Sequence, residues 1–299
     1  MILFVRDSLE SVVGVPEIVG YIFSFLFGAV IGSFLNVVIH RVPNEESIVF
    51  PNSACPKCGS GIKAYDNIPI LSWLALRGKC RNCKEPISPR YPAVEFLTAL
   101  LYLAVYWQIG FGGFLPIALV FVSTILALIF IDSEHMILPN VITYPLLGFA
   151  VLVRVIFPSF FAGTYISDLN WWPISQFNDL HPIIQSVLGA LLGALVGGGF
   201  LWAVGELWKR LRGVEAMGLG DVKMMAAVGA LLGWRLTLLS TFLGAFSGAL
   251  VGIVMIARQK DRDLQTQIPF GIFLGIGSII ALLFGDRLIV WYLTTFIQY

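Results

Sequence analysis

The stretch IVGYIFSFLFGAVIGSFLNVVI, from Ile18 to Ile39, contains 22 residues and no charged side chain. About 20 apolar residues in helical conformation are enough to cross the hydrocarbon core of a bilayer. The run is too long for the core of a cleavable signal peptide, and the preceding residues, Met1 to Glu17, hold one Arg and three acids. We therefore expect an uncleaved membrane-spanning helix near the N-terminus.

The composition of the whole chain agrees with this expectation. Of 299 residues, 58% are hydrophobic and 12% are charged, whereas a soluble domain carries about 25% charged residues. The apolar runs lack the alternation of a barrel, so a helical bundle is the class that satisfies the backbone in lipid. The sequence predicts an all-α polytopic membrane protein with about eight transmembrane helices. They lie near residues 18–40, 91–110, 114–132, 139–158, 182–206, 220–233, 236–257 and 270–297.

Basic residues predict the orientation of this bundle. Most of the 19 Lys and Arg residues fall in three connections, 41–90, 207–223 and 258–263, which eight spans place on one side. The opposite loop, 159–181, contains neither Lys nor Arg. By the positive-inside rule the basic side is cytoplasmic, so both termini face outward. The net charge of +1 gives no indication of a nucleic-acid partner.

Small residues recur at four-residue spacing in several spans, which places each set on one helix face. We interpret these sets as sites of close helix packing rather than of chemistry. They are Gly28/Gly32, Gly189/Gly193/Gly197, Gly244/Gly248/Gly252 and Gly271/Gly275.

All four cysteines lie in the one sizeable polar insertion, residues 44–90. They form the pairs CPKC (Cys55, Cys58) and CRNC (Cys80, Cys83). Two such pairs can offer four thiolates to one tetrahedral zinc ion. The insertion is too small and polar to fold around a core of its own, so a structural metal has a clear role. Two disulfides or a redox pair are the alternatives, and a cytosolic location disfavours disulfides.

Two acids stand at the ends of apolar runs on the predicted cytoplasmic side. Asp132 follows STILALIFI, and Asp221 precedes VKMMAAVGALLG. Acids beside spanning segments are functional candidates. A structural explanation is also open, because Asp221 could cap the helix that follows and Asp132 could mark the point where the chain leaves the lipid.

The predicted helix ends suggest an aspartic dyad. Asp132 would lie near the negative end of one helix dipole and Asp221 near the positive end of another. The first carboxyl would then stay protonated and the second ionised, as in an aspartic dyad that activates water. Gly218 and Gly220 would let a substrate backbone approach closely, and we expect Lys223 to extend toward the membrane surface. The sequence contains no HExxH or GxSxG motif for another kind of hydrolase.

Six motifs occur in the order typical of one family and extend over most of the chain. They are GSFLNVVIHRVP (32–43), the two cysteine pairs, YDNIPILSWLALRGKC (65–80), PISPRYPAVEFLTA (86–99), IDSEHMILPN (131–140) and GLGDVKMMAAVGALLG (218–233). With them the chain resembles the bacterial type IV prepilin peptidases, which also serve type II secretion. It departs from that pattern at Asn140, where the family motif often has Asp.

The resemblance implies specific roles and a domain organisation. The family's catalytic aspartates fall on Asp132 and Asp221, and its zinc ligands on Cys55, Cys58, Cys80 and Cys83. The expected regions are 1–43, an N-terminal transmembrane helix; 44–90, a cytoplasmic zinc-ribbon-like insertion; and 91–299, a GxGD aspartic peptidase domain.

The resemblance further implies a substrate and a second activity. Members cleave the short basic leader of prepilins or pseudopilins after a Gly, at the cytoplasmic face of the inner membrane and just before a hydrophobic helix. Many then N-methylate the new N-terminal residue with S-adenosylmethionine. The sequence shows no nucleotide-binding loop for that cofactor, so the residues that bind it are unknown. By resemblance, the 44–90 insertion is the region expected to bind it. A peptidase without methyltransferase activity, and a transporter or scaffold with acids at its edge, remain alternatives.

Overall fold

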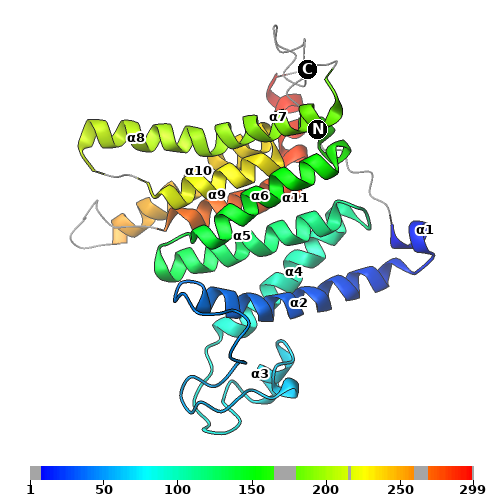
Figure 1. Ribbon diagram of the computed structural model, residues 1–299, viewed down its shortest axis with the longest axis vertical. Coiled ribbons are helices and arrows are strands. Elements are labelled where there is room, and N and C mark those ends of the chain that lie inside the picture. Colours follow the sequence, from blue (N-terminus) through cyan, green and yellow to red (C-terminus); the bar gives the residue numbers. More distant parts are fainter. Residues whose placement is uncertain (1–7, 165–179, 215–216, 259–268, 298–299) are drawn as a thin grey trace. The chain divides into compact units, whose positions relative to one another are not determined.

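The computed structural model (Figure 1) describes residues 8–164, 180–214, 217–258 and 269–297. These residues are almost entirely helical and form no strand, which confirms the predicted fold class. The helices are α1 (Leu9–Val13), α2 (Glu17–Arg41), η1 (Ala64–Asp66), α3 (Leu71–Ala75), α4 (Arg90–Ile109), α5 (Leu115–His135), α6 (Asn140–Ile156), η2 (Pro158–Thr164), α7 (Pro182–Ala194), η5 (Leu195–Gly199), α8 (Phe200–Arg212), α9 (Leu219–Leu232), α10 (Trp234–Arg258), α11 (Phe270–Tyr292) and η6 (Leu293–Ile297).

Every predicted span coincides with a helix, but fewer than eight have the length of a span. Within the described residues six helical stretches are long and apolar enough to cross a membrane, and α6 with η2, bent by 103°, raises the number to seven. The remaining helix, α9, has 14 residues, or about 21 Å of rise against a core of about 30 Å. The protein is a multi-pass membrane protein. Residues 259–263 and most of the 159–181 loop lie outside the described residues, so the orientation stays a prediction.

The chain divides into two compact units within α5, Val5–Ala127 and Leu128–Tyr299. In the N-terminal unit α2 packs along α4, as Figure 1 shows. The two helices pack so closely that these glycines have no room for a side chain. A Cβ at Gly28 would lie 2.8 Å from the Ala99 backbone, and one at Gly32 would lie 2.6 Å from Glu95 Cα. The small residues of α2 thus have the packing role predicted for them.

In the C-terminal unit α9 is surrounded by other helices. It contacts α6, α7, η5, α8, α10 and α11, and α10 and α11 run side by side (Figure 1). Gly193 of α7 and Gly229 of α9 face each other backbone to backbone, so neither position has room for a side chain. Since α9 carries Asp221 in its first turn, this packing fixes one of the two predicted catalytic acids.

A buried arginine anchors the far end of α9. Arg154, fully buried near the end of α6, donates to the carbonyl oxygens of Ser186 at 3.2 Å and Leu231 at 3.1 Å. Its guanidinium also lies 4.5 Å from the centroid of the Phe161 ring. A cation beside the last carbonyls of a helix is favourable because these groups lack intrahelical partners. Arg154 therefore ties α6, α7 and α9 together.

Candidate functional site

The four cysteines of the N-terminal unit converge as predicted. Their sulfur atoms all lie within 4.8 Å of one another, and Cys55 Sγ is 3.8 Å from Cys83 Sγ. Zinc–sulfur bonds of about 2.3 Å in a tetrahedron place the sulfurs about 3.8 Å apart. The donor set and its spacing therefore fit a zinc ion, and all four cysteines are free of disulfides.

Each cysteine pair sits in the same kind of turn. In the first turn the Cys55 N–H donates to Ser60 O and the Gly59 N–H donates to Cys55 O. In the second, the Cys80 N–H donates to Glu85 O and the Lys84 N–H donates to Cys80 O. The isolated bridges Ala54–Gly61 and Lys79–Pro86 close the two turns. The backbone thus holds both pairs in one repeated geometry.

The surroundings of the sulfurs favour thiolates but oppose four of them together. The hydroxyl of Ser60 lowers the pKa of the Cys58 thiol to about 6, and the N–H groups of Cys83 and Asn82 lower the pKa of Cys80. The Glu85 N–H lowers the pKa of Cys83, but burial and the three neighbouring thiols raise it to about 12. Four adjacent thiolates need a cation among them. A bound zinc ion would supply that charge.

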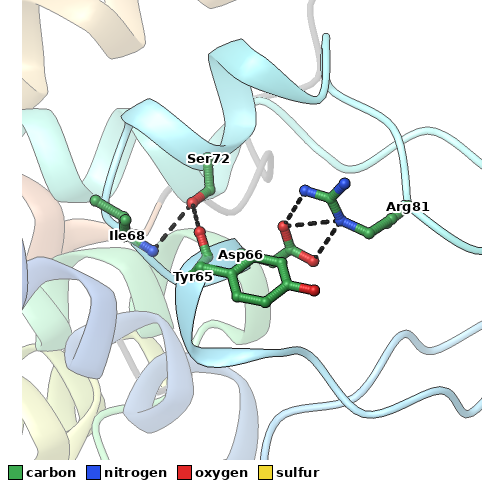
Figure 2. A network of polar contacts seen from close by, with 5 residues as sticks. All are labelled: Tyr65, Asp66, Ile68, Ser72 and Arg81. Atoms are coloured by element: carbon green, nitrogen blue, oxygen red, sulfur yellow. Dashed lines mark hydrogen bonds and ion pairs between the residues drawn. The ribbon is translucent and has the colours of Figure 1, made fainter.

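Polar contacts join the segment between the two cysteine pairs to the second cysteine turn (Figure 2). Arg81, inside CRNC, donates from Nη2 and Nε to the Asp66 carboxylate at 2.6 and 2.8 Å, which lowers the pKa of Asp66. Ser72 Oγ donates to Tyr65 O at 3.0 Å and accepts from the Ile68 N–H at 3.0 Å. The segment between the cysteine pairs is thereby tied to the second turn.

One position in this region carries backbone strain that glycine relieves in its counterpart. Lys84 has φ +61°, and the equivalent Gly59 has φ +69°. A left-handed conformation costs a non-Gly residue about 1–2 kcal/mol, which glycine avoids. Glycine's greater freedom in the unfolded chain offsets about 0.4–1 kcal/mol of this gain. We expect Lys84→Gly to stabilise the insertion by about 0.5–1 kcal/mol, seen as slower zinc loss to a chelator. Lys57→Gly, at an ordinary φ, should accelerate the loss, and a faster loss from Lys84→Gly would contradict the strain.

A second strained residue joins the insertion to α4. Ile70 precedes α3 with φ +63°, which is rare for a β-branched side chain. Its N–H donates at 2.6 Å to Oε2 of Glu95, a carboxylate 8% exposed on α4. A charge-assisted hydrogen bond of this kind stabilises an otherwise unfavourable backbone. Sequence reasoning identified neither residue.

In the C-terminal unit Asp132 and Asp221 meet at the first turn of α11. Both are buried, 5% and 8% exposed. A Cβ at Gly271 would stand 2.8 Å from Asp132 Oδ2 and 3.1 Å from Asp221 Oδ1. The two carboxylates therefore flank a single glycine, although they lie 89 positions apart in sequence. Gly271, which we expected to serve helix packing, instead belongs to the site.

The structural explanation for Asp221 does not hold. Gly218 is the N-cap residue of α9 and has no side chain to cap it, so Asp221, three positions further on, does not occupy the N-cap position. Oδ1 of Asp221 is buried and has no hydrogen-bond partner among the described residues. Asp132, in contrast, accepts the Ile272 N–H on Oδ2 at 3.2 Å. These contacts favour an ionised Asp132 and a protonated Asp221, whereas the ends of α5 and α9 alone suggested the reverse. The difference arises from the N-terminus of α11, which the sequence did not place beside Asp132.

Two neighbours of the dyad also differ from expectation. Gly220 faces the Leu138 side chain, 2.8 Å from its would-be Cβ, rather than open space for a substrate. Lys223 does more than extend toward the membrane surface, since its Nζ donates to Asn140 Oδ1 at 2.8 Å and lies 5.1 Å from the Tyr144 ring centroid. Both contacts join the start of α9 to the start of α6.

Comparisons with known proteins follow the same two regions. Residues 26–109 match the model of the bacterial peptidase A24 N-terminal domain, and residues 119–253 match that of the type IV leader peptidase family. Similar relatives are prepilin leader peptidase/N-methyltransferases. That of Aeromonas hydrophila is 39% identical, with 91% of this chain and 93% of the relative covered. The Pseudomonas aeruginosa protein is 36% identical, with 90% and 92% covered. No solved structure matches the chain.

Proposed function

Because this chain belongs to the type IV leader peptidase family, we propose that it removes the leader peptide of type IV prepilins or type II secretion pseudopilins. Cleavage follows a Gly, just before the hydrophobic N-terminal helix of the substrate. The observation that carries the proposal is the pair of buried carboxylates, Asp132 and Asp221, on either side of Gly271. Paired buried carboxyls suit general acid–base hydrolysis of a peptide bond.

The proposed reaction needs no other group at the reacting atoms. One aspartate takes a proton from water, whose oxygen attacks the scissile carbonyl carbon, while the other gives a proton to the carbonyl oxygen. The resulting gem-diol then collapses. Its carbon–nitrogen bond breaks, the nitrogen receives the proton taken from water, and the second aspartate regains its own. The products are the leader carboxylate and a new N-terminal amine.

The proposed location is the cytoplasmic face of the bacterial inner membrane, with both termini outward. It is supported by the concentration of Lys and Arg in the 41–90 and 207–223 connections. The dyad lies at the ends of its helices, in the last turn of α5 and the first turn of α9, against the first turn of α11. A leader projecting from an inserted substrate helix would reach such a site from the membrane surface.

We propose distinct roles for the parts of the chain. Residues 1–43 anchor it, residues 44–90 hold a structural zinc ion through Cys55, Cys58, Cys80 and Cys83, and residues 91–299 carry out proteolysis. The relatives' names support a second step, N-methylation of the new N-terminal residue with S-adenosylmethionine as methyl donor. Within the described part of the chain we assign no residues to that cofactor.

A single assay separates the alternatives. The full-length protein in detergent is incubated with a prepilin peptide and isotopically labelled S-adenosylmethionine, and the products are weighed by mass spectrometry. We expect a shortened peptide that also carries one labelled methyl group. A shortened but unlabelled peptide would indicate a peptidase alone. An intact peptide would favour a transporter or scaffold.

A further inference from the structure

The first turn of α11 provides a backbone hydrogen-bond donor to one aspartate of the dyad. The Ile272 N–H donates to Asp132 Oδ2 at 3.2 Å. The first N–H groups of a helix have no intrahelical acceptor, and they form the positive end of its dipole. Asp132 is therefore stabilised as an anion, although it lies near the C-terminal end of its own helix.

The other aspartate has the opposite surroundings. Oδ1 of Asp221 is buried beside Gly271 without a hydrogen-bond partner in the described residues. A second negative charge facing Asp132 in a buried site is unfavourable, and retention of a proton removes it. Asp221 is thus suited to remain the neutral acid of the pair.

We infer that the N-terminus of α11 assigns fixed roles to the two aspartates, with Asp132 the base and Asp221 the acid. This inference rests on the proposed function. Asp132 takes the proton from water and later gives it to the leaving nitrogen. Asp221 gives its proton to the carbonyl oxygen and recovers it from the gem-diol. Ile272 is a positioning residue, which acts through Asp132.

Few other charged groups compete for this role. On α5, Glu134 and His135 are exposed. On α9, Lys223 is engaged with Asn140 and Tyr144. Among the described residues of α11, the charged side chains Asp286 and Arg287 lie four turns further along the helix. In the described part of the chain, Asp221 is the titratable group that faces Asp132 across Gly271.

The test removes one N–H donor and leaves the rest of the turn in place. Proline is tolerated in the first turn of a helix, where the N–H has no intrahelical acceptor. Ile272→Pro deletes the donor, and Ile272→Ala deletes the same side chain but keeps the donor. A weaker stabilisation of the anion means that Asp132 gains its proton at higher pH. We expect the acid limb of the pH–rate profile for prepilin cleavage to move up by about one pH unit in Ile272→Pro and to stay in place in Ile272→Ala.

A second measurement covers the case in which Ile272→Pro fails to fold. The residual cleavage by Asp221→Asn should keep the acid limb of the pH–rate profile and lose the alkaline limb, because the base Asp132 remains. Loss of the acid limb instead, or an equal shift in Ile272→Pro and Ile272→Ala, would overturn the role assignment and leave the dyad intact. Full cleavage by Asp132→Asn or Asp221→Asn would remove that residue from the dyad, whereas an intact prepilin after incubation with the parent protein would overturn the proposed function itself.

Discussion

Asp132→Asn and Asp221→Asn are each expected to lower the rate of prepilin cleavage by about 10²–10⁴-fold, the usual contribution of a general acid or base. Asparagine keeps the size of the side chain and cannot exchange the proton. The two carboxyls flank Gly271. Loss of either carboxyl therefore removes one of the two proton transfers that cleavage needs. Cleavage is followed by mass spectrometry over a range of enzyme concentrations, so that slow turnover is still measured.

Glu134→Gln is the matched control for these variants. It makes the same change from carboxyl to amide two positions from Asp132, on an exposed side chain, and should cleave at the normal rate. Elution of each variant as a single species in detergent, with normal zinc content, shows that the protein is folded. Normal cleavage by either Asn variant would remove that residue from the dyad.

Cys55→Ser and Cys80→Ser are each expected to release zinc and unfold the 44–90 insertion. Both sulfurs are buried, and structural zinc sites contribute on the order of 10 kcal/mol or more to the folding of small modules. Without the ion, the remaining thiols and the short turns around them cannot hold a fold of this size. Elemental analysis should show zinc falling from about one per chain to near zero. Limited proteolysis should then cut within the insertion.

Ser53→Ala controls for the substitution itself. It changes a side chain just before the first cysteine pair, while the backbone contact of Ser53 O with the Ile62 N–H remains. This variant should retain zinc and resist the protease as the parent protein does. Unchanged zinc content in Cys55→Ser would refute the metal site, and removal of zinc by a chelator without new cleavage would refute its structural role.

Much of this molecule can be predicted from short-range patterns. The charge-free run from Ile18 to Ile39 predicts α2 because its length and composition alone satisfy the bilayer. The two CxxC pairs predict the sulfur cluster because metal-binding turns are local structures that recur with fixed spacing. The ends of two apolar runs indicated Asp132 and Asp221, because an acid beside a membrane span is energetically costly and is usually kept for a function.

The unpredicted parts depend on contacts between distant segments. Ile272 donates to an aspartate 140 positions away, and no periodicity in α11 indicates which helix its first turn will meet. A Pro-Phe-Gly sequence at a helix start was the available signal, but a glycine there is equally typical of packing. The strain at Ile70 escaped notice for the same reason, because the carboxylate that holds it belongs to α4.

Because α9 is short and enclosed by other helices, the depth of the dyad does not depend on the thickness of the bilayer. Helices in contact with lipid respond to hydrophobic mismatch by tilting or by deforming the bilayer. Most residues of α9 are buried instead against its neighbours in the C-terminal unit, so acyl chains exert no such force on it. Lipids of different chain length would tilt the outer helices, while the level of Asp221 stays set by protein packing. The proposed protease can thus keep its catalytic aspartates at the same depth in membranes of different lipid composition.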